Sequence, residues 1–181
     1  LGNIYYGQQN YTIGYGGGTG LPATGDTLSR VAGMVLTITG GDKVVNSIGA
    51  AISKTGTPTG NINYCFYNQT GGVILTTGTF ETGTNLSTTL TWFEKQIKDL
   101  NGNPMAVRLV NGNTYQIYFW SDGGSNTNFN YFNLNNQYTT NAAPYQDYSW
   151  EGTNGKTLFR NGGGAWTSYN YYDPSMIFNV D

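Results

Sequence analysis

The sequence predicts an all-β protein, an antiparallel β-sandwich of jelly-roll type with an extended N-terminal strand. Apolar and polar residues alternate in many short runs, and this alternation is the side-chain period of a half-buried strand. Clusters of Gly, Asn and Pro separate these runs, and no long run has the period of an α-helix. Roughly ten short strands with turns between them are typical of a sandwich.

The composition indicates one globular domain of unusually low charge. The chain has 181 residues, enough to bury a core without disulfides. Aromatic residues make up 15%, which argues against disorder, whereas charged residues make up only 10%. The formal net charge of −2 and the lack of a basic patch argue against nucleic acid as a partner. No apolar stretch approaches the roughly 18–20 residues of a membrane span.

The first 25 residues differ from the rest. Tyr11, Ile13 and Tyr15 alternate with polar residues, as in a strand. A glycine-rich hinge follows, formed by Gly16, Gly17, Gly18 and Gly20. We therefore divide the chain into residues 1–25, an extended strand with its hinge, and residues 26–181, the β-sandwich domain.

The central strands of the sandwich are the best patterned. Residues 30–39 and 48–54 alternate, and a turn with Pro58 leads into residues 61–67. In that stretch Ile62, Tyr64 and Phe66 share one face, and Asn61, Asn63, Cys65 and Tyr67 share the other. We expect the pair of strands at residues 48–54 and 61–67 to lie at the centre of a sheet.

The second half of the chain continues the pattern. Residues 105–110 and 114–120 flank an Asn-Gly turn at Asn111, which is a strong hairpin signal. Residues 93–100 fit either one helical turn or an irregular crossing. Further strands are expected at residues 73–77, 88–93, 148–151, 157–159 and 175–180, and residues 121–147 are predicted to form a loop.

The residue types argue against catalysis. The chain has no histidine, which removes the commonest general base and metal ligand and excludes Ser–His and Cys–His nucleophile systems. Paired carboxylates could still hydrolyse glycosides, but most acidic residues lie in Gly- and Asn-rich turns. Residues 122–126 lack the spacing of a calcium loop. We predict a protein that is not an enzyme and needs no cofactor or metal.

The lone cysteine, Cys65, is expected to be a buried strand residue, because no cationic neighbour in the sequence would activate it.

Aromatic residues and sequons suggest contact with sugars. Tyr118, Trp120, Tyr148 and Trp150 are candidates for sugar stacking if they lie on a solvent-exposed face, and core packing is the competing interpretation for at least half of them. Asn10, Asn68 and Asn85 begin N-glycosylation sequons. The chain begins at Leu1 without methionine, which fits a processed secreted glycoprotein or a trimmed chain.

A family resemblance is carried by the spacing of several short stretches. They are residues 45–48, 54–62, 66–67 and 112–115, followed by Trp166, Asp173 and residues 177–180. Together they resemble secreted jelly-roll modules of prokaryotic and viral surface proteins, which are similar to carbohydrate-binding domains. The resemblance covers about residues 26–181 and contains no catalytic signature. It implies an extracellular β-sandwich and is compatible with ligand binding, adhesion or polymer formation.

The N-terminal strand offers two interpretations. It is either the first strand of its own sandwich or a strand donated to a neighbouring subunit, where it would add to an open sheet edge. Donation from each copy to the next would build an open, head-to-tail filament. The leading hypothesis is a structural subunit of an extracellular pilus-like or thread-like filament, similar in assembly logic to donor-strand filaments of archaea and bacteria. Its partners would be copies of itself and, secondarily, glycans.

Pairing of the strand wholly within one chain would instead favour the alternative, a carbohydrate-binding or adhesin module of a secreted or viral surface protein. A viral capsid or spike protein is a third option.

Overall fold

Antiparallel strands make up almost all of the chain that the structure describes. The computed structural model describes residues 9–14, 31–55, 57, 60–89, 91–99, 101–121, 128–134, 156–160, 167–169, 173–174 and 176–180. The strands are β1 (Gln9–Gly14), β2 (Val31–Thr37), β3 (Lys43–Thr55), β4 (Asn61–Asn68), β5 (Val73–Thr82), β6 (Thr91–Gln96), β7 (Val107–Leu109), β8 (Thr114–Ser121), β9 (Asn128–Leu134), β10 (Lys156–Arg160), β11 (Thr167–Tyr169), β12 (Asp173–Pro174) and β13 (Met176–Val180). Within these ranges the helical structure is one 3₁₀ turn, η2 (Gly83–Asn85). The all-β prediction is confirmed.

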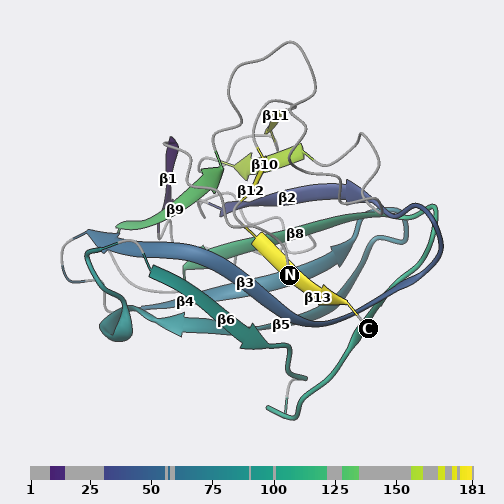
Figure 1. Cartoon of the computed structure of the whole chain (residues 1–181), viewed down its shortest axis with the longest axis horizontal. Coiled ribbons are helices and arrows are strands. Elements are labelled where there is room, and N and C mark those ends of the chain that lie inside the picture. The colour runs from purple at the N-terminus through teal and green to yellow at the C-terminus, as the bar shows by residue number, and fades with distance from the viewer. Residues whose placement is uncertain are drawn as a thin grey trace.

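The strands form two sheets that face each other (Figure 1). The six-stranded sheet has the order β11-β10-β2-β8-β4-β5. The seven-stranded sheet is built on the long strand β3, whose residue Ile52 pairs with Thr91 of β6 on one edge and with Tyr131 of β9 on the other. Strand β7 continues the β6 edge of β3, β13 pairs on the β9 edge, and β1 and β12 join through β9.

The hydrophobic core lies between the two sheets. Leu36, Phe66 and Ile117 come from the six-stranded sheet, Ile48 and Ile52 come from β3, and all five are fully buried. Burial of each such side chain contributes roughly 1.5–3 kcal/mol. The shared face predicted for Ile62, Tyr64 and Phe66 of β4 is confirmed, and it is the face that is turned to the core.

A second buried cluster covers the outer face of the six-stranded sheet. Cys65, Tyr118 and Trp120 form it, with Val35, Tyr67 and Ile74 packed against them. Strand β8 is therefore buried on both faces, unlike a strand that turns one face to water.

Two β-bulges interrupt strand β5, which lies at one end of the six-stranded sheet. In β5, Phe80 and Leu75 are each an extra residue opposite β4, because Asn63 pairs with Thr79 and Tyr67 pairs with Ile74. Bulges increase local twist and disturb the ladder, which makes an edge strand a poor template for a further strand. In the register of the described residues, β5 ends the six-stranded sheet, so these bulges protect that end.

Three sequence predictions changed. The strands at residues 48–54 and 61–67 were expected together at the centre of one sheet, but they belong to β3 and β4, which lie in different sheets. Alternation gives the two faces of a strand and not its neighbours. Residues 121–147 were predicted as loop, and this is wrong for β9, which spans Asn128–Leu134. Asparagine is depleted in strands, so alternation of Asn with aromatic residues gave a weak signal. Residues 93–96 belong to strand β6, and an isolated bridge between Lys98 and Pro104 follows, so no helical turn forms there. The predicted boundary at residue 25 and the expected strand at 148–151 lie outside the described residues.

Candidate functional site

Strand β1 lies at one end of the seven-stranded sheet and closes the side of the sandwich. It runs antiparallel to β9 of the same chain, from Gln9 opposite Asn133 to Gly14 opposite Asn128 (Figure 1). It also approaches β2 and β8 of the six-stranded sheet. The strand is therefore placed where the two sheets meet.

The register of β1 places the donor-strand candidates Tyr11 and Ile13 at positions on the core-facing side of the seven-stranded sheet. Tyr11 is opposite Tyr131, and Tyr131 is opposite Ile52, whose side chain is fully buried in the core. Positions in one such row share a face of the sheet, so the position of Tyr11, and that of Ile13 two residues on, belongs to the core-facing side. Thr12 and Asn130 form the next row, on the opposite face. Tyr15 and the hinge residues Gly16, Gly17, Gly18 and Gly20 lie outside the described residues.

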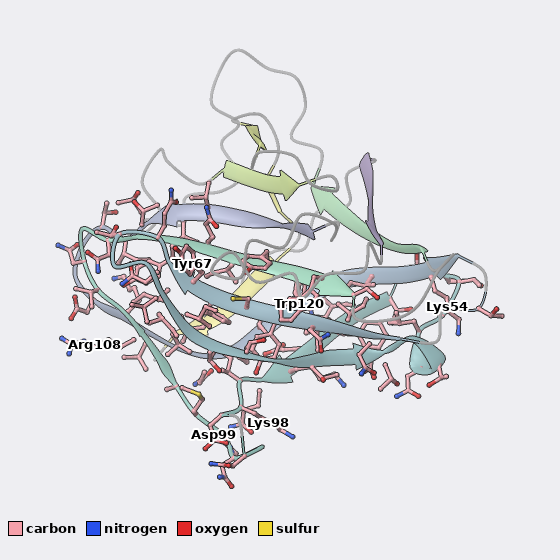
Figure 2. The ribbon with its side chains drawn as sticks, turned by 180° about the vertical axis from the view of Figure 1, so that it is seen from behind. Lys54, Tyr67, Lys98, Asp99, Arg108 and Trp120 are labelled. Carbon is pink, nitrogen blue, oxygen red and sulfur yellow. The ribbon has the colours of Figure 1, made fainter. Side chains whose placement is uncertain are left out.

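Two of the sugar-stacking candidates are buried. Tyr118 is fully buried and Trp120 is 7% exposed, and their ring centroids are 6.1 Å apart. Both belong to the cluster on the outer face of the six-stranded sheet, where Figure 2 labels Trp120. Stacking of a sugar needs an exposed ring face, so these two residues do not meet the condition on which their prediction depended. Tyr148 and Trp150 lie outside the described residues.

The sequon asparagines differ in their surroundings. Asn68 ends β4, and its Oδ1 accepts a hydrogen bond from the Gly71 N–H at 2.9 Å. Asn85 lies in the exposed 3₁₀ turn η2, and its Nδ2 donates to Glu81 Oε1 at 3.0 Å. Asn10 lies in β1 opposite Phe132.

The described carboxylates have structural partners. Lys95 Nζ lies 2.7 Å from Glu81 Oε2, and the Glu81 side chain also accepts from Thr82 N–H and Asn85. Burial alone would raise the pKa of Glu81, but these hydrogen bonds and the Lys95 charge outweigh it and hold that pKa below its ordinary value. Across the described ranges, no group of three or more Cys, Asp or Glu side chains gathers as a metal site would require.

The Asp42 carboxylate fastens two turns together. It accepts from the backbone N–H of Asn111 at 2.8 Å and pairs with the Arg108 guanidinium. The hydrogen bond from Asn111, with that from Arg108, lowers the pKa of Asp42. This contact joins the turn before β3 to the turn between β7 and β8.

Sequence analysis missed an outward-facing strip on β6, which we call the β6 strip and define as Trp92, Glu94 and Gln96. These alternate residues are opposite Ala51, Gly49 and Ser47 of β3. Trp92 is half-buried, whereas Glu94 and Gln96 are exposed. Alternation alone could not reveal which face of residues 91–96 meets water, because Trp and Phe occupy adjacent positions.

Comparison with known proteins gives no relative, because no family model, curated protein or solved structure matches the chain. Nor do the described residues include a helix long and apolar enough to cross a membrane.

Proposed function

We propose that this chain is a non-enzymatic, extracellular subunit of a pilus-like or thread-like filament, a sandwich of jelly-roll type that exchanges β1 between copies. The observation that carries the proposal is the position of β1. Within the part of the chain that the structure describes, β1 is a short strand that pairs with β9 alone, and its Tyr11 shares a row with the buried Ile52. A segment of this kind can make the same contacts with a second copy, as in domain swapping.

The pairing of β1 with β9 within one chain is the arrangement that we expected of a carbohydrate-binding or adhesin module. The filament proposal therefore requires this pairing to be a closed form from which exchange starts. The glycine-rich residues 16–20 follow β1 and suit a connection that changes direction between the closed and exchanged forms. Low charge, at 10% of residues, favours close packing of copies. N-glycans on Asn10, Asn68 or Asn85 would lie on the surface of such a fibre.

A disulfide test distinguishes exchange from closure. Thr12 and Asn130 are directly opposite, and Cα atoms of opposite residues are roughly 4.5–5.5 Å apart, within the range of a disulfide. The single variants Thr12→Cys and Asn130→Cys would be unfolded together, refolded and oxidised. Exchange predicts a disulfide-linked dimer of the two variants on a non-reducing gel. Pairing of Thr12→Cys with Asn101→Cys, whose cysteine lies in an exposed turn, is the matched control and should give none.

The double variant, with both cysteines in one chain, completes the test. Exchange predicts a ladder of linked copies, and negative-stain microscopy of the unmodified protein should show fibres. If the mixed single variants stay monomeric while the double variant forms only an internal disulfide, β1 belongs to its own chain and the filament proposal is wrong. The carbohydrate-binding or adhesin module would then be the better candidate.

A further inference from the structure

The β6 strip includes an aromatic side chain that packs closely on the seven-stranded sheet. A Cβ placed on Gly49 would lie 2.5 Å from Cζ2 and 3.2 Å from Cε2 of Trp92, so the Cζ2 edge of the indole meets the glycine backbone. Only glycine leaves room for this approach. The rest of the Trp92 side chain is partly open to solvent.

Hydrogen-bonding groups continue along the same face. Glu94 is opposite Gly49, and its Oε1 accepts from the Ser47 hydroxyl at 2.9 Å. Gln96 is opposite Ser47 and is exposed. Two residues along a strand span roughly 6.5–7 Å, so the backbones of Trp92, Glu94 and Gln96 are evenly spaced along one face. The indole edge reaches Gly49, which is opposite Glu94, so the ring and the carboxylate belong to neighbouring positions of the sheet.

We propose that the β6 strip binds a neutral hexopyranose unit of a polysaccharide. A pyranose has a C–H face that packs on an indole and hydroxyl groups around its rim that donate to a carboxylate and exchange hydrogen bonds with an amide. The Ser47 bond holds the Glu94 side chain along the sheet, which orients it before a ligand arrives. The formal net charge of −2 and the carboxylate itself disfavour an acidic sugar.

This inference is independent of strand exchange. Strand β6 pairs with one edge of β3, and β9 with the opposite edge. A protein that does not bind sugar could therefore still pass the disulfide exchange test. A protein that does not exchange β1 could still bind a polysaccharide through the β6 strip.

The test is affinity electrophoresis in native gels that contain dextran, mixed-linkage β-glucan or galactomannan. The chain has a sequence pI near 4.9 and migrates toward the anode at pH 8, where binding retards it. We expect retardation by at least one polysaccharide, its loss in Trp92→Ala, and about tenfold weaker binding in Glu94→Gln, which removes charge-assisted hydrogen bonds. Tyr67→Ala is the matched control, because Tyr67 is a half-buried aromatic residue of the other sheet, and it should bind like the parent protein.

Melting temperatures separate binding from folding. Glu94→Gln keeps the size of the side chain and should melt like the parent protein, so it decides the matter even if Trp92→Ala folds poorly. Unchanged mobility of the parent protein in all three gels overturns the proposal, as does retardation that survives Glu94→Gln undiminished. Binding to an immobilised oligoarginine peptide without any polysaccharide binding would identify a cation-binding strip and also overturn it.

Discussion

At the scale of single residues, the hydroxyl of Tyr64 ties a projecting loop to the core. It accepts a hydrogen bond from the Lys98 N–H at 3.0 Å and donates to the Lys98 carbonyl at 3.4 Å. Thr76 Oγ1 donates to the same carbonyl at 3.1 Å. Lys98 and Asp99 lie in the loop that extends away from the sheets (Figure 2), so this contact fixes where the loop leaves the sandwich.

Tyr64→Phe should destabilise the protein by about 1 kcal/mol, because the ring still fills the core and only the hydrogen bonds to Lys98 are lost. For a chain of this size the melting temperature should fall by roughly 2–4 °C. Thermal unfolding followed by circular dichroism measures it. Tyr67→Phe is the control, since the described contacts give that half-buried hydroxyl no hydrogen bond, and an equal loss there would contradict the assignment.

Glu81 should make stability sensitive to acid. Its pKa is lower in the folded protein than the ordinary value of 4.5, so its contribution is complete above that value and is lost as the pH falls through the folded pKa. The urea midpoint should therefore decrease from pH 6 to pH 3, and Glu81→Gln should narrow that decrease. Part of the decrease in the urea midpoint should remain in this variant, because the pKa values of Asp42 and Asp99 are also lowered. If the urea midpoint of Glu81→Gln falls between pH 6 and pH 3 as much as that of the parent protein, the contact of Glu81 with Lys95 contributes nothing to stability.

Cys65 should be inert in the folded protein. Burial raises the pKa of its thiol to about 12, an effect that a hydrogen bond with Tyr118 partly offsets. Ellman's reagent at pH 8 should give no signal with the native protein and one thiol per chain in guanidinium chloride. Rapid reaction without denaturant would mean that the outer cluster opens.

At the scale of elements, strands β2 and β8 leave no room for a side chain at Gly33. A Cβ on Gly33 would overlap the carbonyl oxygen of Ile117 and the Cα of Tyr118, which are backbone atoms that cannot rotate away. Gly33→Ala should therefore cost about 2–3 kcal/mol, through strain of the ladder between the two strands. Gly72→Ala is the control: it has open space and φ of +66°, and about 1 kcal/mol of backbone strain is expected. Urea unfolding of both variants would rank them, and equal costs would argue against the close contact.

The strands that alternate cleanly were predictable from sequence. Strand β8 follows the hairpin signal at Asn111, and its alternating residues Tyr115, Ile117 and Phe119 share the face that is turned to the core. Strand β9 was not predictable, since its Asn-rich pattern is that of a loop by propensity and pairing with β1 and β3 overrides it. Bulges at Leu75 and Phe80 also leave no sequence signal, because they arise from the register with β4.

The candidate sites were less predictable. Composition identifies Trp120 as an aromatic residue able to stack, but only the packing of the outer cluster shows that it is covered. The packing of Trp92 on Gly49, which lies far from it in the sequence, is likewise seen only in the structure. Local patterns give the face of a residue, whereas exposure depends on which elements pack above it.

At the scale of the whole molecule, the two ends of the sheets differ. Strand β5 ends the six-stranded sheet with two bulges, and the salt bridge from Lys95 to Glu81 joins it to β6 of the other sheet. Strand β1 lies at one end of the seven-stranded sheet, where it pairs with β9. In the exchange that we propose, β1 of one copy would take the place beside β9 of the next copy, and the bulged end at β5 would remain protected.

Deletion of residues 1–15 should leave a folded sandwich that forms no fibres, because the exchanged strand is gone while the core residues of β3, β4 and β8 remain. Circular dichroism would confirm the sheet structure, and negative-stain microscopy would show single globules. A synthetic peptide of residues 1–15 added to the truncated protein should bind it with one-to-one stoichiometry. Fibres formed by the truncated protein would contradict the assembly mechanism.

The seclusion of Cys65 has a practical consequence. Because Cys65 is buried in a cluster with Tyr118 and Trp120, the chain can be labelled with thiol-reactive dyes or spin labels without first removing its own cysteine. Any cysteine introduced at the surface would be modified alone, so each probe would report on its own location while the native residue stays in place.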